Sequence, residues 1–415
     1  MELETTLDVL SNPSPKDNAQ VVSLRQKAHD ILAENSTSKP DTLPSALLDL
    51  LTQIIKPLFT SAKHPALTSM GRKNLIPPGP SLGNRFNYPL TDDDLKPWKT
   101  PFTVPLLHYI ITSYSGTLPL DTRKQTLEAH FHLLIPPILN MIDDGDAAFK
   151  AAGCQLLQLL CEALASTESE MLRKTGLGDV FFDALKANFM LLPTLTPEEE
   201  SLEVLTALYP AFFAVVDARY RTGKVTAEQS VGDSNEFAGR QERLKLLLRH
   251  GVLASLSHLS AGQSFSTSIS ISLTTYLVSQ IAPVMTRMGI DGVRYLREFL
   301  PMMRGGLMDP FALAAPDLVK EILRVYVVVL DECEPRVREL WWSEILRGLV
   351  GCWVNCLDEL DVTRSESKGG VQEIQAVLKE VTRRLGQVVD KDKWAAGRKR
   401  LLGEEEDLTG LFEDI

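Results

Sequence analysis

The chain contains few cysteines, and it has fewer basic than acidic residues. Five Cys in 415 residues is an odd number at low density, which does not fit a disulfide framework. Lys and Arg together number 43 against 54 Asp and Glu, and the net charge is −11. Because this charge repels a phosphate backbone, we expect no direct nucleic-acid partner.

The sequence also lacks the signals of export and membrane insertion. Its start, "MELETTLDVL", has no basic segment ahead of an apolar one, so we expect no secretory signal. No uncharged apolar run approaches the roughly 20 residues that cross a bilayer. We therefore expect a cytoplasmic or nuclear chain with reduced thiols and no membrane partner.

Motifs of common enzymes are missing too: no P-loop, G-x-S-x-G or H-E-x-x-H sequence occurs. The cluster "DDGD", residues 143–146, could be a calcium loop, a catalytic carboxylate cluster or the corner between two helices. A calcium loop needs a bidentate Glu at its twelfth position, where this chain has Cys154 or Gln155. Adjacent acids at the start of a helix do not imply a pair that faces across a cleft. We interpret the cluster as a corner.

Two other pairs of residues are candidate metal ligands. His130 and His132 would point about 200° apart on a helix. Cys352 and Cys356 share a helical face, but no second pair lies nearby in the sequence to complete four ligands. We therefore expect no catalytic residue, no cofactor and no metal.

Apolar residues follow the helical period through most of the chain. Near its end, one face carries Ile374, Val377, Leu378, Val381, Leu385 and Val388. One segment, residues 266–278, includes "SISISLTTYLV", which alternates as a strand does. The pattern leaves this segment open between helix and strand, and helix is favoured because a single strand among helices has no partner.

Two eight-residue segments share one pattern: "DDGDAAFK", residues 143–150, and "DECEPRVR", residues 331–338. Each begins with two acidic residues, ends with a basic one, and lies between two apolar helical segments. This predicts a helix–acidic corner–helix unit of about 40 residues, and hence an all-α fold, an elongated α-solenoid of HEAT-like helical repeats. The predicted corner residues are Asp143, Asp144, Lys150, Asp331, Glu332 and Arg338. We expect the acids to cap the second helix and the basic residue to reach a carboxylate of an adjoining repeat.

Interruptions of the helical pattern divide the chain into six predicted segments. These are N-terminal helices with flexible linkers (1–64), a proline-rich loop pinned by aromatic residues (65–101), the solenoid core (102–360), a flexible linker (361–370), C-terminal amphipathic helices (371–402) and an acidic tail (403–415).

Six apolar residues are candidates for partner binding: Trp341, Trp342, Trp353, Leu408, Leu411 and Phe412. The three Trp are more than one helical stripe can bury, so we predict that at least one contacts a neighbouring repeat and another a partner. Leu408, Leu411 and Phe412 either anchor a short docking peptide in a partner's groove or belong to an ordinary frayed terminus. The basic cluster at residues 391–400 is a nuclear address, an acid-binding patch or a solvated helix end.

The order of these features resembles the family of the second Tel-two-interacting protein, the Tti-two family. The resemblance rests on "HPALTSMGRKNL", "RFNYPL", "KPWK", "LIPPILNMIDDGDAAFKAAGCQLLQLL" and "LRKTGLGDVFFDAL". It runs from Pro65 to Leu357 and is most specific from Pro136 to Leu185.

This resemblance implies a non-catalytic subunit of the TTT complex, with the first Tel-two-interacting protein and Tel-two as partners. With the Hsp-ninety chaperone system and its co-chaperones, that complex matures and stabilises phosphatidylinositol-3-kinase-related kinases, which act in DNA-damage, telomere and nutrient signalling. Two alternatives stay open: a HEAT-repeat adaptor in nuclear transport or trafficking, and an enzyme whose site assembles from scattered residues.

Overall fold

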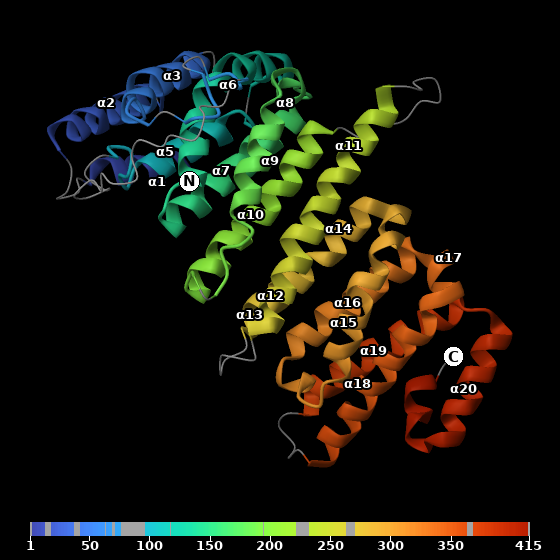
Figure 1. Ribbon diagram of the computed structural model, residues 1–415. Coiled ribbons are helices and arrows are strands. Elements are labelled where there is room, and N and C mark those ends of the chain that lie inside the picture. Colours follow the sequence, from blue (N-terminus) through green and yellow to red (C-terminus); the bar gives the residue numbers. More distant parts are fainter. Residues whose placement is uncertain are drawn as a thin grey trace, which may run out of the picture. The chain divides into compact units, whose positions relative to one another are not determined.

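The computed structural model describes residues 2–12, 18–36, 42–62, 64–68, 71–75, 96–116, 118–193, 195–220, 232–262, 270–362 and 368–413. Most of these residues lie in helices, and no strand occurs among them apart from an isolated bridge between Leu67 and Lys73 (Figure 1). Helices pack against helices throughout the described part. The prediction of an all-α helical-repeat fold is confirmed.

The chain divides into two compact units. Unit 1 comprises residues 1–191 and 199–236, and unit 2 comprises residues 192–198 and 237–415. The predicted solenoid core, residues 102–360, extends over parts of both.

Unit 1 is built from helices of very different lengths. They are α1 (Glu2–Ser11), α2 (Ala19–Ser36), α3 (Leu43–Asp49), η2 (Leu50–Ile55), α4 (Lys56–Leu58), α5 (Thr103–Ser113), α6 (Leu120–Ile142), α7 (Ala147–Ser166), α8 (Met171–Thr175), α9 (Leu177–Ala187) and α10 (Glu198–Arg219). Helix α11 (Gly232–Leu246) begins in unit 1 and ends in unit 2.

Helices α6 and α7 pack closely on each other near the predicted acidic corner. A Cβ atom at Gly153 would lie 2.8 Å from the Ile142 amide nitrogen, so α7 needs a glycine there to approach the end of α6. The apolar face of α7 is fully buried at Leu156, Leu157, Leu160 and Leu164. Burying each such side chain contributes roughly 1.5–3 kcal/mol, so this face stabilises the pair.

Pro136, inside α6, shapes the surface that lies against Gly71. Proline has no N–H to bond the carbonyl four residues earlier, so Pro136 leaves the His132 carbonyl without its usual helical donor. Gly71 adopts φ +69°, and a Cβ atom there would lie 2.5 Å from the His132 oxygen. Only glycine therefore allows the chain to pass this close to the interrupted helix.

Trp98 is the described aromatic residue that pins the predicted proline-rich loop. It is 2% exposed, stacks on Phe59 with 5.1 Å between ring centroids, and meets the edge of Phe149 at 5.4 Å. Residues 69–70 and 76–95, including Phe86 and Tyr88, lie outside the described residues.

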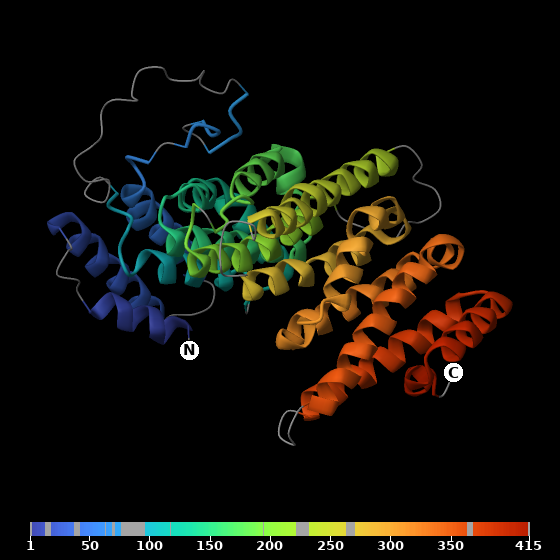
Figure 2. The same cartoon turned by 60° about the horizontal axis from the view of Figure 1, so that its bottom comes forward.

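Unit 2 continues the helical pattern. Its elements are η4 (Leu247–Leu253), α12 (Ala254–Gly262), α13 (Ile271–Ser279), α14 (Ile281–Met288), η5 (Gly289–Tyr295), α15 (Leu296–Met308), η6 (Ala312–Ala314), α16 (Pro316–Glu332), α17 (Glu334–Arg336), η7 (Val337–Trp341), α18 (Trp342–Val362), α19 (Lys368–Val388), α20 (Lys391–Glu404) and η8 (Glu406–Phe412). Helices α15, α16 and α18, drawn in orange, lie side by side in both views (Figure 1 and Figure 2).

Three predicted stretches can be compared with the structure: the segment 266–278, the linker 361–370 and the tail 403–415. The segment with strand-like alternation is helical from Ile271 onward, while residues 263–269 lie outside the described residues. The predicted linker 361–370 begins with the end of α18 and finishes with the start of α19; residues 363–367 lie outside the described residues. Within the predicted acidic tail, Glu406–Phe412 form the short helix η8, and residues 414–415 lie outside the described residues.

Helix α10 is the one described helix that is long and apolar enough to cross a membrane by length and composition. However, 67% of its most apolar window is buried inside the structure. A core helix has this property, because its apolar residues already have protein neighbours.

Candidate functional site

The first acidic corner joins α6 to α7, and its N-cap is Asp146. The Asp146 carboxylate accepts hydrogen bonds from the Ala148 N–H at 3.0 Å and the Phe149 N–H at 3.3 Å. The prediction that Asp143 and Asp144 cap this helix is therefore wrong. Asp143 and Asp144 both precede the N-cap in the turn, and their carboxylates contact side chains outside α7.

Asp144 is the buried charge of the corner. Its side chain is 1% exposed and lies 2.8 Å from Lys96 Nζ and 2.9 Å from Lys99 Nζ. It also accepts the Asp146 N–H at 2.9 Å. Burial alone would raise the pKa of Asp144, but hydrogen bonds from Lys96, Asp146 and Lys99 outweigh it and lower the pKa. The carboxylate thus ties the end of the proline-rich loop to the corner.

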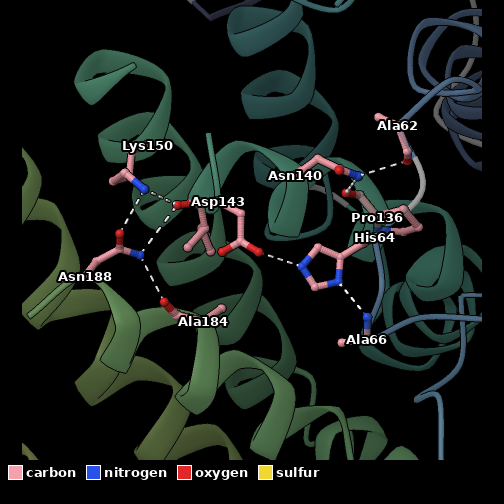
Figure 3. A network of polar contacts seen from close by, with 10 residues as sticks. Ala62, His64, Ala66, Pro136, Asn140, Asp143, Lys150, Ala184 and Asn188 are labelled. Carbon is pink, nitrogen blue, oxygen red and sulfur yellow. Dashed lines mark hydrogen bonds and ion pairs between the residues drawn. The ribbon is translucent and has the colours of Figure 1, made fainter. Parts of the chain in front are cut away.

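Asp143 and Asn140 hold the segment that enters the same loop. Asp143 Oδ2 lies 2.7 Å from His64 Nε2, and Asn140 Nδ2 donates to the Ala62 carbonyl at 3.2 Å (Figure 3). A cavity of about 330 Å³ beside these residues is lined by charged groups that already pair with one another. The corner therefore contacts the chain at both ends of the predicted loop.

Lys150 links α6, α7 and α9 through polar contacts. Its buried amine donates to the Ile142 carbonyl and to Asn188 Oδ1, each at 2.8 Å, and Asn188 Nδ2 donates to the Ala184 carbonyl at 2.9 Å (Figure 3). Burial lowers the pKa of Lys150. The prediction of a carboxylate partner is wrong, because in the described part of the chain the neighbouring helix offers an amide oxygen.

The second corner is more exposed. Asp331 Oδ1 lies 3.6 Å from Arg384 on α19. Arg338 pairs with Glu334 on the next turn back and donates from Nε to the Val388 carbonyl at 3.0 Å. The Asp331–Arg384 pair joins neighbouring helices, and such exposed pairs are worth about 0.2–1 kcal/mol. The prediction that Arg338 reaches a carboxylate of an adjoining repeat is wrong, because its carboxylate partner, Glu334, lies only four residues away.

The acids of the second corner also fail to cap a helix. Glu332 is the last residue of α16. The N-cap of α17 is Cys333, which makes no side-chain cap hydrogen bond. The two corners share a sequence pattern, but their acidic residues make different contacts.

The three candidate Trp residues occupy different environments. Trp353 is 4% exposed, and its indole N–H donates to the Asp407 carbonyl at 3.2 Å. Trp341 and Trp342 are half-buried, and a Cβ at Gly397 would be 3.5 Å from the Trp342 ring. Trp353 is therefore a core residue of unit 2, whereas partner contact by Trp341 and Trp342 stays a prediction.

The apolar residues of the tail pack on their own chain. Leu408 is 2% exposed, and Leu411 and Phe412 are 0% exposed. Helix η8 lies against α18, α19 and α20, and Arg398 donates to the Phe412 carbonyl at 3.0 Å. The prediction of Leu408, Leu411 and Phe412 as partner anchors is contradicted, because their apolar surface is already buried within unit 2.

The basic cluster of residues 391–400 lies on α20, where Lys391, Lys393, Lys399 and Arg400 are exposed. Arg400 lies 3.7 Å from Glu404 one turn later. The three interpretations of this cluster stay predictions.

Of the two candidate metal-ligand pairs, both cysteines are buried, whereas His130 is buried and His132 is exposed. All five cysteines are free and buried. The hydrogen bond with Cys356, followed by burial, raises the pKa of Cys352, so that thiol is held protonated. Among the described residues, no group of three or more His, Cys, Asp or Glu could hold a metal ion.

His130 gives the fold a predicted pH dependence. It is 4% exposed, and its Nδ1 lies 2.9 Å from the Tyr114 hydroxyl. Burial, and to a lesser degree His132, lowers the pKa of His130. The unfolded chain, with a His pKa of about 6.5, therefore binds this proton more readily. Stability should fall as the pH falls through about 6.5 toward the folded pKa, by at most about 1.4 kcal/mol per pH unit.

The variant His130→Gln should flatten this dependence, because glutamine can still bond Tyr114 but does not titrate. Urea unfolding between about pH 7 and pH 5 measures the slope. His108→Gln, at a half-buried histidine on α5, is the matched control and should keep the wild-type slope. Equal slopes for wild type and His130→Gln would contradict the assignment.

Comparison with known families gives one match. A family described as the Tti2 family matches residues 7–314, which is well over half of the chain. The match begins in α1, earlier than the sequence resemblance from Pro65, and ends before α16. No similar protein was found among curated proteins, and no solved structure was found to be similar.

Proposed function

The chain belongs to the Tti2 family, and from this premise we propose that it is a non-catalytic scaffold subunit of the TTT complex. Its partners are then Tel-two and the first Tel-two-interacting protein. The observation that carries the proposal is the family match over residues 7–314. Helices that pack on one another, as they do within each unit, suit a protein that holds others.

The finer part of the proposal concerns what the assembly does. With the Hsp-ninety system, the chain supports the maturation and stability of phosphatidylinositol-3-kinase-related kinases. Its most reactive residue types support a structural role: Cys352 and Cys356 are buried in the core, and Asp144 and Lys150 bind helices and loops together. Five buried free thiols fit a reducing compartment, so we place the function in the cytoplasm and nucleus.

Affinity purification of the tagged full chain, followed by mass spectrometry, tests the subunit role. Both other TTT subunits should be recovered in amounts comparable to the bait, whereas the tag alone should recover neither. A transport adaptor would instead change its partners when a GTP-loaded small GTPase is added. Absence of both TTT subunits from the purified material would overturn the proposal.

A further inference from the structure

The connection between α15 and α16 carries an unusually exposed aromatic residue. Its sequence, "MDPFALAAP" at residues 308–316, contains a single charged residue. Phe311 is 81% exposed and Met308 is 43% exposed. An exposed Leu or Met alone is ordinary, but an almost bare Phe within an apolar turn calls for a partner.

The turn is held firmly by hydrogen bonds. Asp309 Oδ1 accepts the Phe311 N–H at 2.8 Å. From α18, Asn355 Nδ2 donates to the Asp309 carbonyl at 2.8 Å and to the Leu307 carbonyl at 3.3 Å. Phe311 is thus displayed on a preorganised turn, and binding through it costs little ordering entropy.

Neighbouring apolar groups extend this surface onto α18. A Cβ atom at Gly351 would lie 2.7 Å from Met308 Cγ, so Met308 lies directly over that glycine. Val354, three residues farther along α18, is 36% exposed. We call Met308, Phe311 and Val354 the Phe311 patch.

Acidic residues lie close to the patch along the chain. Asp309 lies in the turn, Asp317 lies in the first turn of α16, and Asp358 follows Val354 by one turn of α18; all three are exposed. Within the described residues, Asp358 forms no ion pair, and Asp317 interacts electrostatically with Lys320, one turn later on α16. Arg347, which is exposed, lies one turn before Gly351 on the same face of α18. The patch therefore favours a complement that is apolar at its centre and basic beside the acids.

We propose that the Phe311 patch docks a partner protein that offers an apolar socket edged by lysine or arginine side chains. The inference rests on the proposed function, because it supplies a surface with which the subunit holds a partner of the complex. An aromatic anchor in a desolvated socket is the usual source of binding energy at such contacts. The acidic rim sets orientation and speeds association.

Two full-chain variants test the patch by quantitative affinity against the purified partner subunits. Phe311→Asp should weaken binding roughly 30-fold or more, as expected for a central anchor. Asp358→Lys should weaken it by a smaller factor, on the order of 5-fold, and raising the salt concentration should weaken wild type but not this variant to the same degree. Ile290→Asp, at a side chain that is 59% exposed in the same unit, is the matched control and should bind as wild type. Circular dichroism should show all three variants folded.

A photo-crosslinking residue in place of Phe311 identifies what covers the patch. The expected product joins position 311 to an apolar site of a partner subunit flanked by lysine or arginine. Crosslinks only to a second copy of this chain, or to an acidic site, would overturn the inference. Phe311→Asp binding as tightly as wild type would also overturn the inference. If wild type itself binds neither TTT subunit, the proposed function fails. That result differs from one in which wild type and Phe311→Asp both bind with equal affinity.

Discussion

Asp144→Ala should lower the free energy of unfolding of unit 1 by about 3 kcal/mol. Removing one partner of a buried ion pair typically costs about 3–5 kcal/mol, because the remaining charge is left uncompensated. We expect the lower value of this range because Lys96 and Lys99 are 26% and 15% exposed and can regain part of their hydration in the variant. The variant also removes the acceptor of the Asp146 N–H.

Asp143→Ala is the matched control in the same corner. Asp143 is 43% exposed and pairs only with His64 among the described side chains, so its loss should cost about 0.2–1 kcal/mol. Urea unfolding gives the free energies, and hydrogen exchange of α6 and α7 peptides assigns them to unit 1. Equal losses for the two variants would contradict the role given to Asp144.

The same contact has a defined pH window. Because the pKa of Asp144 is lowered in the folded chain, its contribution is present above the unfolded value of about 3.9. It is lost as the pH falls through the folded pKa. The difference between wild type and Asp144→Ala should therefore shrink in strong acid and stay constant near neutral pH.

The helices could be predicted from the sequence because apolar spacing reports directly on which face is buried. The periodic residues from Ile374 to Leu385 lie on α19, where Ile374, Leu378 and Leu385 are buried. The segment beginning at Ile271 was ambiguous because its short alternation fits both periods. In the structure its Leu273 and Leu277 lie one helical turn apart and are both buried.

The corner was located correctly, but its contacts were not. Asp146 could have been chosen as the cap, because it directly precedes the apolar run of α7, the position that favours Asp. The partners of Asp144 and Lys150 could not have been found this way. Lys96 is 48 residues from Asp144, and Asn188 is 38 residues from Lys150, and no local pattern relates residues so far apart.

The tail shows a second limit of sequence patterns. Leu408, Leu411 and Phe412 have the spacing of a docking helix, and that spacing is the same whether the groove belongs to another protein or to the chain itself. Here the tail contacts its own chain at Trp353, Trp394 and Arg398, with 6.0 Å between the ring centroids of Trp394 and Phe412. Conversely, Phe311 stood out only in the structure, because its exposure depends on the turn that Asp309 and Asn355 fix.

Rapid depletion of the chain should shorten the half-lives of several phosphatidylinositol-3-kinase-related kinases together. Their messages should not change, because the chain is proposed to act on the proteins after synthesis. A binding partner stabilises a folded state by mass action, so loss of the scaffold exposes its clients to degradation. Re-expression of wild type should restore the half-lives.

Re-expression of point variants after depletion distinguishes a scaffold role of the chain from a catalytic one. His132→Gln, at an exposed histidine, and Cys356→Ala, at a buried thiol, should rescue as well as wild type when they are folded. If a folded His132→Gln or Cys356→Ala variant did not restore the kinase half-lives, that residue would have a chemical role that the scaffold account does not include.

Kinase half-life after depletion is the measurement that tests the scaffold role most directly. The account predicts a coordinated shortening that wild type and both rescue variants reverse. Half-lives that stay unchanged after the chain is gone would contradict it.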